Sequence, residues 1–244
     1  MAFQYREGQQ TYDELKQTVI SEETHSPSLP VPATEEEIPP PVETAAAPEC
    51  TLEDKISVPL NVDFDLLIGQ NPDTVGWVYI EGTHINYPVL QGEDNRHYVS
   101  TLFDGSFNQA GSIFMDYRNS PRMDDVHTIL YGHNMRDKSM FADILNYQQQ
   151  EYYDAHPTGF YITPEKSYSF EVIAAYVASL ADPAWQLDFV TEEELVSWVQ
   201  DAMSRSAFQS RIQPQPGDKV ITLSTCSYEF DEARFVLVGI LKEI

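Results

Sequence analysis

A cysteine, a histidine and an arginine stand where predicted strands begin or end, and these residue types together can carry out nucleophilic catalysis. Cys226 ends an apolar, β-branched run, and His133 follows Gly132 at the end of a similar run. Arg234 lies eight residues after Cys226. A thiol at a strand end has a stiff backbone support, an imidazole can exchange protons, and a guanidinium is a permanent cation. The pattern predicts Cys226 as the nucleophile, His133 as the acid and base, and Arg234 as the group that stabilises the anionic intermediate.

The protonation states of this triplet cannot be fixed from sequence. An unperturbed cysteine has a pKa of about 8.5 and an unperturbed histidine one of about 6.5. With those values, neutral thiol and neutral imidazole predominate near neutral pH. Arg234 favours the thiolate but disfavours the imidazolium, so its net effect on the Cys226–His133 pair stays open.

Several short segments resemble the sortase family. Thr222-Leu223-Ser224-Thr225-Cys226 with the later arginine, preceded by Gly132-His133-Asn134, is similar to the active-site set of sortases, and its five-residue form resembles class B in particular. Other sortase-like segments follow in the same order: Gly76-Trp77-Val78, Ile85-Asn86-Tyr87-Pro88-Val89, Gly92-Glu93-Asp94-Asn95 and Arg234-Phe235-Val236-Leu237. The resemblance covers residues 72 to 244, and the shared order makes it more specific than any single motif.

The resemblance implies a cysteine transpeptidase. Such an enzyme cleaves the C-terminal sorting signal of a secreted surface protein, forms a thioacyl-enzyme at Cys226, and transfers the acyl group to an amine of a peptidoglycan precursor. It also implies a substrate groove lined by Asn95 and Ser224, with Thr225 as a further candidate. The residues alone leave alternatives: a helix cap for Asn95, a strand-pairing hydroxyl for Ser224, and either core or groove wall for Trp185, Tyr228 and Phe230.

Three other functions remain open at this level. A pilin-polymerising sortase would use a lysine as the acceptor amine, and a cysteine endopeptidase would use water. The papain layout is not met, because His133 precedes Cys226. The non-enzymatic alternative is a wall-associated barrel that only binds peptide.

Charge and hydropathy restrict the partners. The chain has 244 residues and a formal charge of -25, which repels phosphate backbones and argues against nucleic-acid binding. No run of about 18 apolar residues and no signal-peptide layout occurs. The resemblance implies an enzyme on the extracellular face of the membrane of a Gram-positive cell, held by an N-terminal anchor that is absent from this chain.

We expect no cofactor and no metal. His127 and His133 lie six residues apart on one predicted strand, but no cluster of cysteines and histidines completes a metal site around them. The second cysteine, Cys50, lies in a stretch rich in proline, alanine and glutamate, where we expect an incidental thiol.

The predicted fold is mainly β. Short polar turns separate eight strand-like runs without alternating helices, which favours a closed barrel or a sandwich; the resemblance implies the eight-stranded sortase barrel. The runs span residues 75–80, 85–90, 113–115, 126–131, 159–163, 168–180, 219–225 and 235–241.

Helices are predicted at four places: residues 11–20, 63–69 with Gly69 at the end, 140–153, and 191–208. The last lies between the sixth and seventh strands, a position that matches class B sortases. It begins with a capping box at Thr191 and Glu194 and a hydrophobic staple from Val190 to Leu195.

Residues 26–48 contain many prolines and predict an extended spacer. We therefore expect residues 1–62 to form a helix and an acidic, partly disordered spacer, and residues 63–244 to form the catalytic domain.

Overall fold

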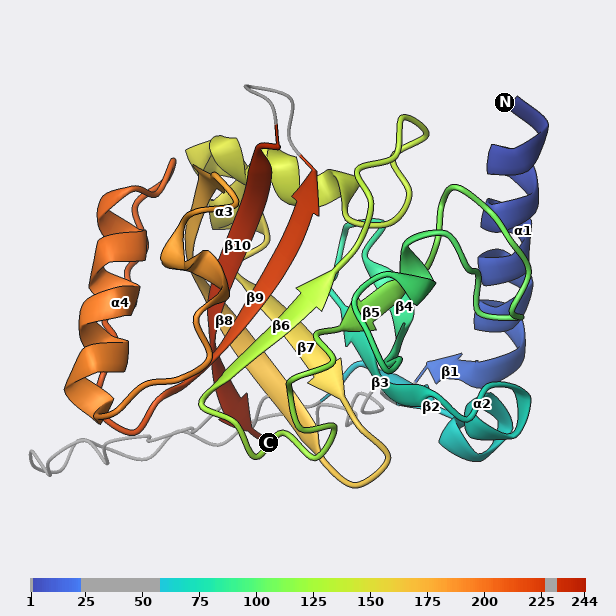
Figure 1. Ribbon diagram of the computed structural model, residues 1–244, viewed down its shortest axis with the longest axis horizontal. Coiled ribbons are helices and arrows are strands. Elements are labelled where there is room, and N and C mark those ends of the chain that lie inside the picture. The colour runs from blue at the N-terminus through green and yellow to red at the C-terminus, as the bar shows by residue number, and fades with distance from the viewer. Residues whose placement is uncertain (1, 23–57, 227–231) are drawn as a thin grey trace, which may run out of the picture.

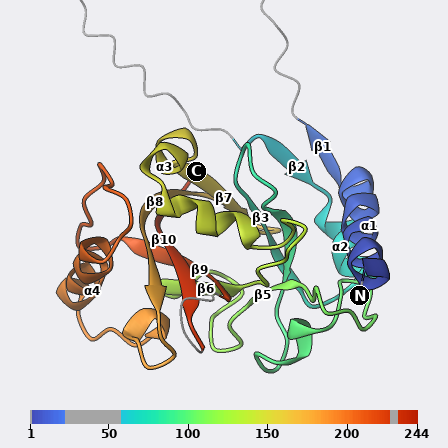
Figure 2. The ribbon, with the colours of Figure 1, turned by 90° about the horizontal axis from the view of Figure 1, so that it is seen from above.

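A closed barrel of eight strands forms the centre of the protein. The computed structural model describes residues 2–22, 58–226 and 232–244. The helix α1 (Ala2–Val19) lies at one flank of the barrel and α4 (Glu192–Ser204) at the other (Figure 1). The view from above also places the two helices on opposite sides (Figure 2). The prediction of a closed eight-stranded barrel is confirmed.

Most barrel strands that are consecutive in sequence are also neighbours in the barrel, but β7 pairs with β3, β6 with β9 and β8 with β10 across longer stretches of chain. Their order around the barrel is β10-β8-β7-β3-β4-β5-β6-β9, and the pairing of β9 with β10 closes the sheet. Neighbours are antiparallel except for β4 with β5 and β6 with β9, which are parallel. The strands are β3 (Thr74–Tyr79), β4 (Asn86–Leu90), β5 (Ile113–Met115), β6 (His127–Tyr131), β7 (Thr158–Ile162), β8 (Ser167–Ala178), β9 (Lys219–Cys226) and β10 (Arg234–Glu243). Each of them overlaps one of the predicted runs.

Shorter elements surround the barrel. They are β1 (Ile20–Glu22), β2 (Leu60–Val62), α2 (Phe64–Gln70), η1 (His97–Val99), η2 (Ala142–Gln148), α3 (Gln150–Ala155) and η3 (Pro183–Trp185), where η marks a 3₁₀-helix. β1 pairs with β2 in an antiparallel ribbon that the sequence did not predict. The predicted spacer and Cys50 lie outside the described residues.

Several helix boundaries differ from the prediction. α4 ends at Ser204, four residues before the predicted end, and the predicted segment 140–153 forms η2 and α3, which reach Ala155. α1 begins at Ala2, nine residues before the predicted start. The apolar periodicity that locates a helix begins only at Tyr12, so no sequence signal marks the first turns. α2 continues past Gly69 to Gln70, and Asn71 in an extended conformation ends it by donating its N–H to the carbonyl of Leu67. The glycine is therefore not the terminator.

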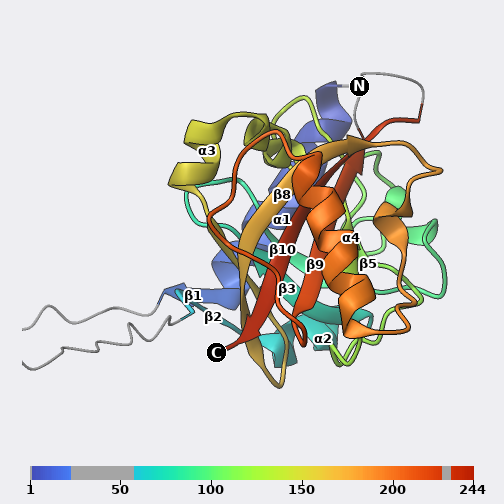
Figure 3. The same cartoon turned by 90° about the vertical axis from the view of Figure 1, so that its left-hand side faces the viewer.

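Strand alternation builds two apolar layers. On β9, Ile221 and Leu223 belong to the core cluster inside the barrel, whereas Val220 belongs to a second cluster on the outer face. α4 covers this outer cluster with the face formed by its buried residues Leu195, Trp198, Val199 and Ala202. Figure 3 shows α4 lying in front of β8, β9 and β10. α4 connects the sixth barrel strand, β8, to the seventh, β9, as predicted.

The N-terminus of α4 is capped in part as expected. The hydroxyl of Thr191 accepts a hydrogen bond from the N–H of Glu194 at 3.2 Å. The carboxylate of Glu194 accepts from the N–H of Val190 at 2.8 Å. The side chain of Val190 is 90% exposed, so the predicted hydrophobic staple with Leu195 does not form.

α1 packs directly against the barrel. Tyr12, Leu15 and Val19 are buried within the same core cluster as the barrel interior. The hydroxyl of Tyr12 donates to the carbonyl of Gly111 at 2.9 Å. Of the helices in the described ranges, none has both the length and the apolar character that crossing a bilayer requires.

Candidate active site

Three neighbouring strands bring the predicted catalytic residues to one rim of the barrel. β6 and β9 are parallel and both end at this rim, with Tyr131 opposite Ser224 (Figure 1). The N–H of Gly132 donates to the carbonyl of Ser224 at 3.1 Å and extends this pairing by one residue, just before His133. On the other side of β9, Arg234 is the register partner of Cys226. The backbones of all three residues therefore meet at the ends of β6, β9 and β10.

Cys226 is described only as the last residue of β9. Its side chain and the predicted groove residues Tyr228 and Phe230 lie outside the described part of the structure.

A groove opens at this rim, with a cavity volume of about 410 Å³. Every substrate or catalytic candidate whose side chain is described lines it: His133, Arg234, Asn95, Ser224 and Thr225. Trp185 lines it as well and, partly buried, also packs against the outer apolar cluster, so it serves both the groove and the core. The sequence reasoning missed the other wall residues, Val99, Phe114, Tyr131 and Leu180. Their apolar character is the same as that of core residues, so no sequence signal separated them.

The imidazole of His133 is oriented by a backbone carbonyl. Its Nε2 lies 2.7 Å from the carbonyl oxygen of Val99. Because a carbonyl oxygen only accepts hydrogen bonds, this contact places a proton on Nε2. In the neutral ring Nδ1 is then the basic nitrogen.

The guanidinium of Arg234 is half-buried at the start of β10. Its Nη1 donates to the carbonyl of the preceding residue, Ala233, at 3.0 Å. A guanidinium carries five N–H donors in a planar fork. One contact to the backbone therefore holds the group at the groove without using its capacity to bind anionic or carbonyl oxygens.

Asn95 belongs to a polar network centred on a buried carboxylate. Its Nδ2 donates to Asp116 Oδ2 at 3.0 Å, and its Oδ1 accepts from the N–H of Tyr117 at 3.0 Å. Asp116 is fully buried and also accepts from Arg118 Nε at 2.9 Å and from the hydroxyl of Tyr131 at 2.9 Å. The amide of Asn95 is thus fixed in place, yet it retains a second hydrogen and a second lone pair for a peptide.

The charge of Asp116 is maintained inside the protein. Burial alone would raise the pKa of this carboxyl, but the hydrogen bonds from Arg118 and Tyr131 hold the pKa below its usual value. The ion pair with Arg118, at 2.8 Å between Nη2 and Oδ2, compensates the buried charge. The network supports the wall that carries Asn95 and Tyr131.

Two hydroxyls that line the groove lack a hydrogen-bond partner among the described residues. Ser224 and Thr225 are each 2% exposed, and within the described residues neither Ser224 Oγ nor Thr225 Oγ1 has a hydrogen-bond partner. Buried hydroxyls are normally paired, because an unpaired one costs free energy. These atoms are therefore candidates for hydrogen bonds to a bound peptide.

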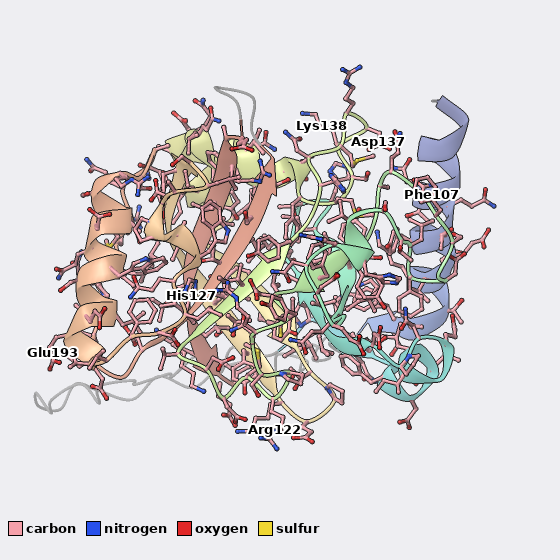
Figure 4. All side chains as sticks on the ribbon, in the orientation of Figure 1. Phe107, Arg122, His127, Asp137, Lys138 and Glu193 are labelled. Atoms are coloured by element: carbon pink, nitrogen blue, oxygen red, sulfur yellow. The ribbon has the colours of Figure 1, made fainter. Side chains whose placement is uncertain are left out.

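A second histidine, at the opposite end of β6, does not line the groove. His127 begins β6 and is fully buried on the side of the barrel that α4 covers (Figure 4). Its Nδ1 donates to the carbonyl of Gln186 at 2.6 Å, and its Nε2 lies 2.8 Å from the hydroxyl of Thr222. Burial lowers the pKa of His127 to about 4. Across the ranges the structure describes, no three residues of the metal-binding types form a group that could hold an ion.

The connection from β8 to α4 forms one wall of the groove and is fastened at several points. Arg205 pairs with Asp182 through both nitrogens, at 2.6 and 2.8 Å. The indole of Trp198 donates to the carbonyl of Pro183 at 2.9 Å. With the bond from His127 to Gln186, these contacts hold the segment that presents Trp185 and make the groove a fixed feature of the fold.

Comparison with known proteins agrees with this geometry. The profile of the sortase domain matches residues 78–242. Sortase B of Listeria monocytogenes is 37% identical over 171 residues, which cover 69% of this chain and 70% of that protein. Sortase B of Staphylococcus aureus is 33% identical over 181 residues, which cover 74% of each.

Solved structures give the same result. A crystal structure of Staphylococcus aureus sortase B matches with a TM-score of 0.70 at 33% identity and covers 74% of this chain and 87% of that chain. Sortase B from Bacillus anthracis in complex with AAEK1 matches over 100% of both chains, with a TM-score of 0.77 at 26% identity.

The chain belongs to the sortase family. Within that family it is a class B sortase, and hence a cysteine transpeptidase.

Proposed function

We propose that this sortase cleaves a C-terminal sorting signal of a secreted protein and transfers the resulting acyl group to a cell-wall amine. The observation that carries the proposal is the convergence of His133, Cys226 and Arg234 on three adjacent strand ends beside one groove. A nucleophile, an acid–base group and a fixed cation within one site are what acyl transfer requires.

The reaction proceeds in two acyl-transfer steps. With the thiol proton transferred to His133, the Cys226 thiolate attacks the carbonyl carbon of the threonine in the signal, and the carbonyl π electrons move onto oxygen beside Arg234. Collapse of this intermediate breaks the peptide C–N bond, and His133 protonates the leaving amine. The acceptor amine then attacks the thioester, gives a proton to His133, and releases the thiolate of Cys226.

Arg234 is suited to the oxyanion because residues opposite each other in an antiparallel pair lie on the same face of the sheet. Arg234 and Cys226 are such a pair. The guanidinium can then stabilise the charge that develops on the carbonyl oxygen, two bonds from the sulfur.

Asn95, Ser224 and Thr225 are proposed to bind the signal peptide. Among the described residues the hydroxyls of Ser224 and Thr225 have no hydrogen-bond partner, and a peptide in the groove would supply one. Staphylococcus aureus sortase B has been solved as a complex with its substrate, and a sortase B has been solved as a complex with triglycine. We infer by similarity that this chain likewise accepts a peptide and an amine at the same rim, on the extracellular side of the membrane.

The test uses a panel of signal peptides, incubated with and without triglycine or a lysine-containing peptide, and mass spectrometry of the products. Formation of a new amide with triglycine supports the proposal. Exclusive hydrolysis identifies an endopeptidase, transfer only to lysine identifies a pilin-type enzyme, and binding without cleavage identifies a peptide-binding barrel.

The proposed role of Ser224 has a matched control within the chain. Ser169 on β8 is also buried with an unpaired hydroxyl, and it does not line the groove. Ser224→Ala should reduce kcat/KM about fivefold or more, while Ser169→Ala should leave it unchanged. Equal activity of both variants would remove Ser224 from the peptide site.

A further inference from the structure

The residue His133 begins a loop, residues 133–141, that closes on its own start. The N–H of Phe141 donates to the carbonyl of His133 at 2.9 Å, and Asn134 pairs with Met140 in an antiparallel bridge. The tip of the loop carries Asp137 and Lys138, and projects beyond the end of the barrel (Figure 4). The backbone of His133 is therefore positioned by the returning end of the loop, at Met140 and Phe141.

Met140 has an unusual backbone conformation. Its φ is 57°, in the left-handed region that non-glycine residues rarely adopt, and its side chain is 1% exposed. Its N–H donates to the hydroxyl of Tyr87 on β4 at 3.0 Å. Without this acceptor a buried N–H would be unpaired, and the strained turn would lose the contact that holds it.

The ring of Tyr87 is held in turn by α1. Tyr12 meets it edge to face, with ring centroids 5.4 Å apart and an interplanar angle of 88°. The Nζ of Lys16 lies 4.4 Å from the centroid of the same ring. Tyr87 itself belongs to β4 and is only 3% exposed. The two contacts from α1 therefore cover its ring.

We propose that Tyr87 is a positioning residue for His133. Its hydroxyl fixes the left-handed turn at Met140, the turn fixes the base of the loop at Phe141 and His133, and α1 keeps the Tyr87 ring in place. This inference rests on the proposed catalytic role of His133. It assigns to α1, which lies on the flank of the barrel, a part in the geometry of the active site.

The test compares Tyr87→Phe with Tyr147→Phe. Tyr147 is a matched control, because it is 0% exposed and its hydroxyl also bonds to a backbone group, the carbonyl of His156, at 2.7 Å. The ring signals of His133 are followed by NMR of ¹⁵N-histidine-labelled protein and assigned with His133→Gln. kcat and KM for a signal peptide are measured on the same samples.

Tyr87→Phe should shift or broaden the His133 ring signals and lower kcat at least about fivefold, with KM within about twofold of the parent. Tyr147→Phe should change neither. Unchanged His133 signals or an unchanged kcat in Tyr87→Phe would overturn the proposal, and so would an equal loss of kcat in Tyr147→Phe.

The contribution of α1 is tested by Lys16→Met, which keeps the apolar stem and removes the cation. This variant should move the His133 signals in the same direction as Tyr87→Phe, by a smaller amount. Signals identical to those of the parent would overturn the role of Lys16. The NMR signals do not depend on turnover, so they test the positioning of His133 separately from the proposed function. If the parent transferred no acyl group, the proposed function would be refuted, and the His133 signals would still decide whether Tyr87 positions His133.

Discussion

Acid should destabilise this protein through His127. Burial lowers the pKa of this histidine to about 4 in the folded protein, against an ordinary value of about 6.5 in an unfolded chain. Between these values the unfolded chain binds a proton that the folded protein does not. Stability is therefore full above about pH 6.5 and is lost as the pH falls toward 4.

The size of this loss follows from the difference between the two pKa values. From pH 7 to pH 5 the His127 contribution amounts to about 2 kcal/mol, and by pH 4 it reaches about 3 kcal/mol. His127→Gln should lower the free energy of unfolding at pH 7 by about 1–3 kcal/mol, because a glutamine cannot keep both hydrogen bonds, to Gln186 and to Thr222. The variant should then lose about 2 kcal/mol less than the parent between pH 7 and pH 5.

Urea unfolding at pH 7, 6 and 5 measures both effects. His97→Gln, which replaces an exposed histidine in η1, is the matched control, and its free energy of unfolding should vary with pH in parallel with that of the parent. If the curve of His127→Gln also ran parallel to the parent, the buried histidine would not be the acid-sensitive group, and the reasoning from its burial would be refuted.

Three further substitutions test the groove. Arg234→Lys keeps the charge but loses the planar fork of donors, so kcat should fall at least about tenfold. Circular dichroism should show that the variant is folded. A rate within about twofold of the parent would assign the stabilisation of the oxyanion to backbone amides. Gly132→Ala would place a methyl group 2.8 Å from Phe141 Cδ2 and should lower the free energy of unfolding by about 1–3 kcal/mol, with parent-like thermal stability as the contradicting result. Asp116→Asn weakens the hydrogen bonds that hold Asn95. It should lower the free energy of unfolding by about 2 kcal/mol and raise the KM for the signal peptide. A KM equal to that of the parent would show that this network does not contribute to peptide binding.

The eight strands could be predicted from the sequence because they carry strong local signals, whereas the choice of a closed barrel over a sandwich came from the family resemblance. β-branched and aromatic runs end at polar turns, and β5 occupies the predicted residues Ile113–Met115. The ribbon of β1 and β2 was missed because three-residue strands far apart in the sequence have no periodicity to detect. The staple at Val190 failed for a similar reason, because the sequence does not indicate which neighbours a side chain at a helix start will meet.

Candidate site residues could be predicted where the chemistry requires a particular residue type. They could not be predicted where only the packing of the fold places an apolar residue in the groove. Cysteine, histidine and arginine at strand ends are rare enough to identify His133 and Arg234, which the structure brings to one groove. Val99 and Leu180 resemble core residues in sequence, and only the closed barrel places them in the groove wall. The network around Asp116 joins residues from three segments, so no single stretch of sequence reveals it.

The central claim, that Cys226 carries the acyl group, is tested most directly by intact-protein mass spectrometry. The enzyme is mixed with a signal peptide in the absence of an amine acceptor and quenched in acid within seconds. We predict a mass increase equal to the acyl half of the peptide, located on Cys226 by proteolytic mapping, removed by hydroxylamine, and absent from Cys226→Ala. An adduct that persists in Cys226→Ala, or that maps to Cys50, would contradict the account.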